Sequence, residues 1–190
     1  MAIPIAKYLF MYTGSPSRDK LIRHTALPHV EELAKPWLNL EAYREARVRE
    51  AVYEAELAEE FLKSGLVRNA AGKAFQAWKS LLGALLVDKI EEVEKAYPGV
   101  VRIREGKRIK KALWVIALVP TSQMKKLAQL LGGEESALTS IALDLHSYQY
   151  NGPDPEGIYS PYPDEKSAQR DVEILVGKVK EYVAKLPRRS

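Results

Sequence analysis

The sequence predicts an all-α fold, an antiparallel bundle of about five to six helices preceded by an irregular N-terminal arm. Long segments carry apolar residues at steps of three and four, which is the spacing of one helix face. Glycine or proline follows most of these segments, as is typical of helix ends. One apolar segment could also form a strand, but no second strand is evident to pair with it.

Residues 1–39 form the predicted arm, because Gly14, Pro16 and Pro28 interrupt any periodic pattern. We expect this arm to pack across the body of the protein or across a partner chain. Residues 40–186 form the bundle, and residues 187–190 form a basic tail. A chain of 190 residues has room for one domain with extensions.

The first predicted helix spans residues 40–64. Asn39 is a suitable N-cap, because its side-chain oxygen can accept a hydrogen bond from an amide of the first turn. Gly65 ends the helix, since glycine tolerates a left-handed backbone. The charged residues, Arg44 and Arg47 among them, are assigned to the solvent-exposed face. The apolar face consists of Val48, Ala51, Val52, Ala55, Ala58 and Leu62.

The second predicted helix spans residues 67–97 and ends at Pro98 and Gly99. A tight glycine turn joins it to the first helix, so the two should form an antiparallel hairpin. Small residues on the second helix would let a neighbouring backbone approach closely. These residues are Ala70, Gly72, Ala74, Ala77 and Gly83.

Residues 107–119 are apolar enough for a buried strand or a buried helix, and we expect a helix because no partner strand is evident. A short helix should follow Pro120 and end at Leu131. Residues 134–150 form another helix. Asp164 caps the last helix, which continues to Leu186 and has the clearest apolar face in the chain.

The composition excludes several functional classes. The chain has no cysteine and only three histidines, which are scattered, so we expect no metal site and no cofactor, with a metal held by carboxylates alone as the open alternative. No apolar run approaches the roughly 20 residues that a membrane helix needs, so we expect a cytoplasmic protein without membrane contact. The net charge of +4 by itself does not indicate nucleic-acid binding. Helices rich in glutamate, lysine and arginine would suit a thermophile.

Three blocks of sequence carry a family resemblance. They are KPWLNLEAYREARVREAVYEAE (35–56), EAELAEEFLKSGLVRNAAGKAFQAWKSLLGALL (54–86) and ALDLHSYQYNGPDPEG (142–157). They resemble the archaeal PaREP-type family, which is similar to the HEPN superfamily of helical bundles. The resemblance covers roughly residues 35–185. It implies a bundle that tends to dimerise and an association with nucleotide or RNA binding, and some HEPN-like proteins pair with small nucleotidyltransferases.

The resemblance also implies how a ribonuclease of this kind would look. Such members carry an arginine, four to six further residues and then a histidine near the end of a late helix. His146 occupies the histidine place here, but the arginine positions hold Thr139, Ser140 and Ile141. Ribonuclease activity is therefore not expected.

The second helix contains one candidate binding site. Asn69, Lys73, Gln76 and Ser80 follow one another at steps of four, three and four, so they share a face. Lys73 could meet a phosphate, and Asn69 could hydrogen-bond a base or a ribose. The alternative is an ordinary solvated helix face.

His146 and Tyr150 form a second candidate, because residues four apart lie along one helix face. Together they could stack on a base. The alternative is a buried histidine that locks two helices together. A third candidate is a phosphate-facing edge formed by Arg104, Arg108 and Lys111, which belong to the densest basic run in the chain. This run could equally be a solvated face.

The leading hypothesis is a non-catalytic, homodimeric module that binds nucleotide or RNA. The alternative is a protein-interaction module that partners a nucleotidyltransferase or a similar protein. A ribonuclease that uses His146 without the usual arginine comes last, because a lone acid–base group contributes little without a charge stabiliser.

Overall fold

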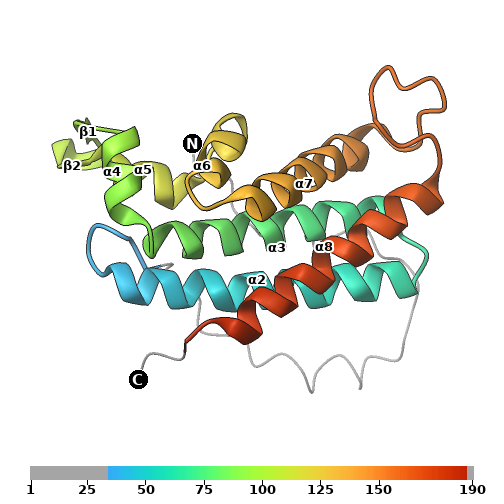
Figure 1. Ribbon diagram of the computed structural model, residues 1–190, viewed down its shortest axis with the longest axis horizontal. Helices are drawn as coiled ribbons and strands as arrows, with labels where there is room; N and C mark the ends of the chain where they lie inside the picture. Colours follow the sequence, from blue (N-terminus) through green and yellow to red (C-terminus); the bar gives the residue numbers. More distant parts are fainter. Residues whose placement is uncertain (1–33, 188–190) are drawn as a thin grey trace. The chain divides into compact units, whose positions relative to one another are not determined.

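The computed structural model describes residues 34–187, which form a helical bundle as predicted. Most of the predicted arm and the end of the basic tail lie outside these residues. The elements are α2 (Leu40–Lys63), α3 (Val67–Val87), α4 (Ile90–Ala96), β1 (Val100–Arg102), β2 (Arg108–Lys110), α5 (Lys111–Leu118), α6 (Met124–Gln129), α7 (Gly133–Asn151) and α8 (Glu165–Lys185). Short 3-10 turns precede β2 and α6 (Figure 1).

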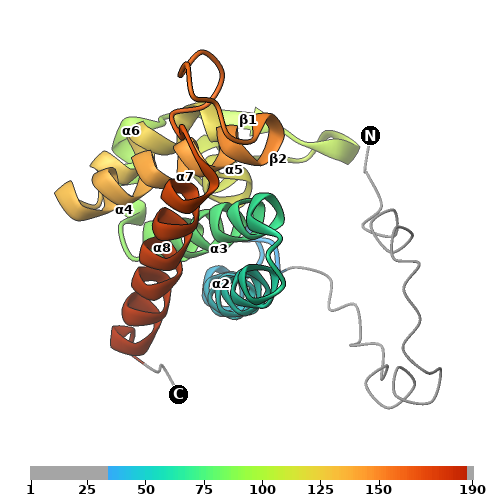
Figure 2. The ribbon, with the colours of Figure 1, turned by 90° about the vertical axis from the view of Figure 1, so that its right-hand side faces the viewer.

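Helix α3 is the centre of the bundle. Helices α2, α7 and α8 pack around it (Figure 2). Side chains on most of its circumference are buried. The contact with α2 consists largely of alanines that are completely buried, which allows the two backbones to approach closely as predicted. These alanines are Ala51, Ala55 and Ala58 on α2 and Ala70, Ala74 and Ala77 on α3.

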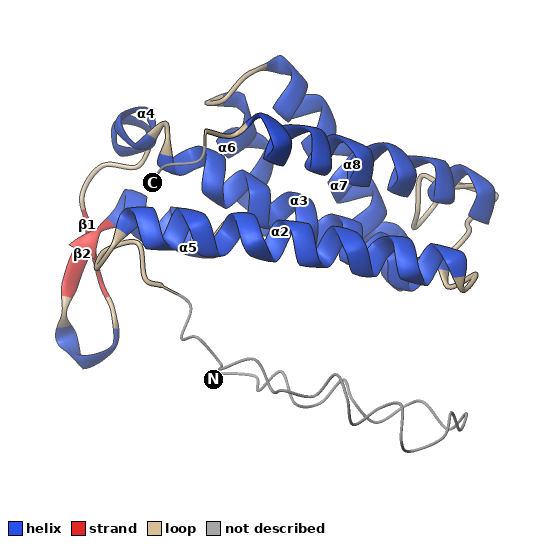
Figure 3. Cartoon of the chain, turned by 90° about the horizontal axis from the view of Figure 1, so that it is seen from below, coloured by secondary structure: helices blue, strands red, loops and turns tan. Residues whose placement is uncertain are grey.

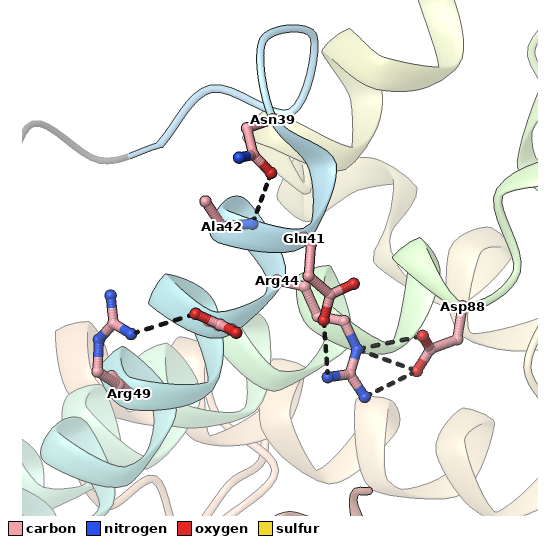
Figure 4. Close-up of polar contacts among 7 residues, drawn as sticks. Asn39, Glu41, Ala42, Arg44, Arg49 and Asp88 are labelled. Carbon is pink, nitrogen blue, oxygen red and sulfur yellow. Dashed lines mark hydrogen bonds and ion pairs between the residues drawn. The ribbon is translucent and has the colours of Figure 1, made fainter. Parts of the chain in front are cut away.

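The predicted N-caps of α2 and α8 are confirmed. The Asn39 side-chain oxygen accepts from the amide of Ala42 at 2.9 Å (Figure 4). Asp164 does the same for the amide of Ser167 at 2.7 Å. Each cap satisfies an amide that the helix itself leaves unpaired.

The prediction of one helix over residues 67–97 is wrong, because α3 ends at Val87 and α4 begins at Ile90. At the break, Asp88 accepts hydrogen bonds from Arg44 of α2, with the nearest nitrogen and oxygen 3.1 Å apart (Figure 4). Aspartate is a weak helix former. The apolar periodicity continues across the break and therefore gave no sign of it.

Arg44 and Arg47 are also not on the solvent-exposed face where the sequence placed them. They are only 3% and 7% exposed, respectively. Each has an acidic partner at the helix interface, Asp88 for Arg44 and Glu50 for Arg47. A buried charge is tolerated when it is paired and hydrogen-bonded in this way.

The prediction of a helix over residues 107–119 is only half right. Residues 108–110 form β2, which pairs antiparallel with β1, and the helix starts at Lys111 (Figure 3). The partner strand is three residues long, too short to show an alternating pattern in the sequence. Ile109 is buried between the exposed Arg108 and Lys110, so the hairpin has one anchored face and one exposed face.

Helix α7 ends next to α3, where Arg68 stabilises its last turn. The Arg68 guanidinium donates to the carbonyl oxygens of Gln149 and Tyr150. A cation at this position complements the negative end of the helix dipole. Gly152 then turns the chain with a positive φ of 72° into the loop 152–163, the orange loop of Figure 1.

The loop 152–163 is held by polar contacts at both ends. The Asp154 carboxylate accepts from the amides of Tyr159 and Ser160. The hydroxyl of Tyr162, which is buried, donates to Asp171 of α8 at 2.7 Å. The loop therefore has a defined conformation between α7 and α8.

None of the described helices is long and apolar enough to cross a membrane.

Candidate functional site

The predicted row on α3 is largely at the surface. Asn69 and Gln76 are exposed, whereas Lys73 is half-buried and forms an ion pair of 2.8 Å with Glu54 of α2. Ser80, the fourth member, is buried. A phosphate at Lys73 would therefore compete with Glu54. The exposed part of the row ends before Ser80, because that side chain is buried.

His146 of α7 lies against this helix. Its ring stacks on Phe75 of α3, with centroids 4.1 Å apart and planes at 24°. Tyr150 meets the same ring edge-on at 5.3 Å. Phe75 and Lys73 are two residues apart and point to different sides of α3, so His146 meets the α7 side of this helix whereas Lys73 meets α2. The two predicted candidates therefore do not join, and His146 is partly the helix-to-helix lock that the alternative described.

Gln149 fixes the orientation of the His146 ring. Its side-chain nitrogen lies 2.6 Å from Nδ1 of His146. The amide oxygen of Gln149 packs against Gly72, where a Cβ would come within 2.4 Å of it. Any larger residue at position 72 would push Gln149 away from His146.

These contacts determine what His146 can do chemically. An amide nitrogen can only donate, so Nδ1 accepts and the ring proton sits on Nε2. Burial lowers the pKa of His146, and the positive charge of Lys79 lowers it further. His146 is therefore a neutral imidazole that offers an Nε2–H donor, which suits hydrogen bonding or stacking better than base catalysis.

At the positions where a ribonuclease would carry its arginine, the side chains pack in the core or hydrogen-bond to the backbone of α7. Thr139 is completely buried, and its hydroxyl accepts from Nε1 of Trp78 at 2.8 Å. The Ser140 hydroxyl donates back to the carbonyl of Ser136, one turn earlier. A guanidinium at position 139 would therefore have to displace packed core side chains.

A group of polar side chains that the sequence did not single out lies between α2 and α3. Arg47 donates to Glu50 at 2.5 Å and to the carbonyl oxygen of Lys79 at 3.4 Å. The Lys79 ammonium lies 6.0 Å from the centre of the Phe75 ring. Burial lowers the pKa of Lys79, and the charge of Arg47 lowers it further. We call Arg47, Glu50, Lys79 and Ser80 the Arg47–Lys79 cluster.

The predicted phosphate-contact residues lie elsewhere, on what we call the basic hairpin, residues 100–111. Arg104, Arg108 and Lys111 are all exposed. Arg102 sits directly opposite Arg108 in the strand pairing. Of the basic side chains here, Lys110 has a described ion pair, with Glu94 of α4 at 2.7 Å. The hairpin packs at the α4 and α5 end of the bundle, away from the row on α3 (Figure 1).

Comparison with known proteins gives a family but no close relative. The model of the archaeal PaREP1/PaREP8 family matches residues 46–173. The chain belongs to this family. No curated protein and no solved structure matches the PaREP1/PaREP8 chain. The wider HEPN-like relationship remains a prediction.

The part of the chain that matches the PaREP1/PaREP8 model contains all the candidate residues. Both Lys73 and His146 have contacts involving α3, but no described contact joins them, and the basic hairpin is separate from both. Sequence reasoning missed Arg47 and Lys79, because a charged residue in an amphipathic helix resembles a solvated one. Glycine at position 83 was the available indication, because a Cβ there would come within 3.3 Å of the Arg47 side chain.

Proposed function

We propose that this PaREP1/PaREP8 protein is a non-catalytic RNA-binding module that works as a homodimer. The observation that carries the proposal is the pairing of Arg102 with Arg108 across the basic hairpin. Like charges directly opposite each other destabilise a strand pair. A feature that costs stability in this way is expected at a functional site, and an RNA backbone would supply the missing negative charge.

The shape of the hairpin supports contact with an extended polyanion. Ile109 anchors one face, while Arg102, Arg108 and Lys110 lie on the other, because residues two apart in a strand share a face. The cations are spread along the hairpin and its turn, where Arg104 adds another. This spread favours a chain of phosphates over a single mononucleotide.

The α7 end of the bundle could add base stacking. Tyr150 is 68% exposed, and its ring contacts His146 edge-on. Exposed aromatic rings bind bases of single-stranded RNA by stacking with little sequence preference. The neutral His146, without a nearby arginine at positions 139–141, supports binding without cleavage.

The first test replaces both opposed arginines, in the double variant Arg102→Thr with Arg108→Thr. Threonine favours strands, so Tm should stay the same or rise. RNA affinity should fall, measured by fluorescence anisotropy with a single-stranded RNA between about 50 and about 200 mM salt. Loss of two phosphate contacts should reduce the slope of log K against log salt by about 1.4.

The matched control removes two positive charges from an exposed face of α8, in the variant Lys166→Ala with Arg170→Ala. Its salt slope and affinity should remain close to those of the wild type. The proposal fails if the wild type does not bind RNA at the lower salt concentration. It also fails if the α8 variant loses as much affinity as the hairpin variant.

A protein-interaction module is the second candidate, and the loop 152–163 favours it. Hydrogen bonds to Asp154, Ser147 and Asn151 hold this loop, yet Ile158 and Tyr159 are 65% and 71% exposed. An ordered loop that presents large apolar side chains is typical of a docking surface. The RNA titration separates the two candidates, because this one predicts no salt-dependent RNA binding.

A further inference from the structure

The interface between α2 and α3 contains two polar atoms without a partner among the described residues. They are Nε of Arg47 and the hydroxyl oxygen of Ser80. The two side chains belong to residues that are only 7% and 1% exposed. Buried polar groups in folded proteins nearly always have a hydrogen-bond partner, because an unsatisfied one costs stability. Two such atoms on facing helices therefore need an explanation.

The two atoms belong to the same stretch of the interface. The Arg47 guanidinium reaches the carbonyl oxygen of Lys79, the residue next to Ser80. Its Nε also packs against Gly83, where a Cβ would come within 3.3 Å of it. Ser80 and Gly83 are one turn apart on α3, so the guanidinium lies along the turn that carries the Ser80 hydroxyl.

The charges here do not balance. Arg47 is paired with Glu50, but Lys79 has no carboxylate within ion-pair distance among the described residues. Burial lowers the pKa of Lys79, and the repulsion from Arg47, which outweighs the attraction to Glu50, lowers it further. Arg47, Lys79 and Glu50 together leave a net positive charge in this partly buried part of the interface between α2 and α3. The Lys79 side chain is half-buried, so it lies between the buried charges and the solvent.

We infer that Arg47, Lys79 and Ser80 form a binding site for a small phosphorylated anion, either inorganic phosphate or the phosphate monoester of a small molecule. A phosphate group has enough acceptor oxygens for the Arg47 Nε–H, the Ser80 hydroxyl and the Lys79 ammonium. The bound anion would satisfy both unpartnered atoms and balance the extra charge. The site uses no residue of the basic hairpin, so it stands apart from the RNA-binding proposal.

The variants Lys79→Met and Ser80→Ala separate binding from stability. Methionine keeps the length of the lysine side chain but removes a repelled charge, and alanine removes an unsatisfied hydroxyl. Both variants should therefore melt at the wild-type temperature or above it when no anion is present. Residues with a purely structural role would show the opposite behaviour. The matched control is Lys73→Met, on the same helix, where the lysine is paired with Glu54.

The experiment compares Tm of the full chain in inorganic phosphate, in adenosine monophosphate and in sodium chloride of equal ionic strength. The wild type and Lys73→Met should show a saturable rise in Tm with phosphate or with the monophosphate. Lys79→Met and Ser80→Ala should bind about tenfold more weakly or worse, as expected when one charge-assisted hydrogen bond is lost. A response to both anions would indicate a site for phosphate itself, and a response to the monophosphate alone would indicate a monoester site.

A second readout is the pKa of His146, followed by NMR of its ring during the same titrations. Because Lys79 lowers this pKa, an anion bound at Lys79 should raise it. The inference is overturned if neither anion differs from chloride for the wild type. It is equally overturned if Lys79→Met responds as strongly as the wild type. The Arg102→Thr and Arg108→Thr variant should keep the phosphate response, whatever its RNA affinity.

Discussion

Three neighbours of His146 each set a different property of its ring. Phe75 holds its plane, the side chain of Gln149 holds its tautomer, and Lys79 adds to the lowering of its pKa that burial begins. Gly72 acts indirectly, because it leaves the space that Gln149 occupies. A histidine held in this way is a defined hydrogen-bond donor at neutral pH.

Acidification should destabilise the protein in part through His146. Its pKa is below the ordinary value of 6.5 in the folded state, so the unfolded chain takes up the proton more readily. The stability that the neutral ring contributes is fully present above the unfolded-state pKa of 6.5. It is lost as the pH falls below 6.5. The variant His146→Phe keeps a stacking ring but cannot titrate. Its Tm should fall less than that of the wild type between about pH 7.5 and about pH 5.5.

The other groups that titrate near this ring do not explain the same effect. The other titratable groups, His24 and His29 among them, are present in both proteins and so cannot produce a difference between the two profiles. Parallel melting profiles for the two proteins would contradict the role assigned to His146.

At the scale of single residues, the sequence predicted the features that depend on local chemistry. Asn39 and Asp164 cap their helices because the cap depends on the amides that follow directly. Arg47 and Lys79 could not be predicted in the same way. Their importance comes from facing helices, and nothing in the local sequence distinguishes them from the solvated charges around them.

At the scale of elements, a long-range ion pair links α2 to the junction between α3 and α4. Arg44 reaches Asp88 from α2, and Glu41 lies 3.8 Å from the same guanidinium (Figure 4). The two partners are unequal, because the Arg44 side chain is nearly buried whereas that of Asp88 is 30% exposed. If Arg44 is removed, water can therefore reach and solvate the Asp88 carboxylate. If Asp88 is removed, water reaches the Arg44 guanidinium less easily.

This asymmetry predicts different costs for the two ways of breaking the pair. Asp88→Asn leaves a buried guanidinium with a weaker partner and should lower the free energy of unfolding by about 2 to 3 kcal/mol. Arg44→Met leaves a carboxylate that water can reach, and it should cost less. Urea denaturation of both variants measures the difference. A larger loss for Arg44→Met would show that the aspartate is the residue that depends on the pair.

The β-hairpin is an element that sequence periodicity could not predict. Strands of three residues contain too few positions to distinguish alternation from a helical pattern. The basic residues of the hairpin were nevertheless noticed, because clustering of charge is visible without knowing the backbone conformation. The opposition of Arg102 and Arg108 needs the strand register, which only the structure provides.

At the scale of the whole molecule, the bundle was predictable because its evidence is summed over many residues. The apolar stripe of α8 agrees with its buried face, which includes Ala168, Val172, Leu175 and Val179. The arrangement around α3 was less predictable, because a helix buried on most sides has no single stripe. Its side chains therefore contact several helices, chiefly α2, α7 and α8, rather than one.

The homodimer is a prediction at the same scale. Large apolar side chains exposed on the single chain, such as Tyr53 on α2 and Ile174 on α8, would be expected at a subunit interface. Light scattering coupled to gel filtration should give twice the mass of one chain at micromolar concentrations. A mass of one chain that persists as the concentration rises would remove the homodimer from the proposal.

The attachment of the basic hairpin has a consequence for motion. The main contacts of the hairpin are with α5, and Lys110 pairs with Glu94 of α4, so we expect the hairpin to open while the rest of the bundle stays closed. Its amides should exchange hydrogen with water sooner than those of α3. RNA bound to the ordered hairpin would slow that exchange locally and leave the exchange of α3 unchanged.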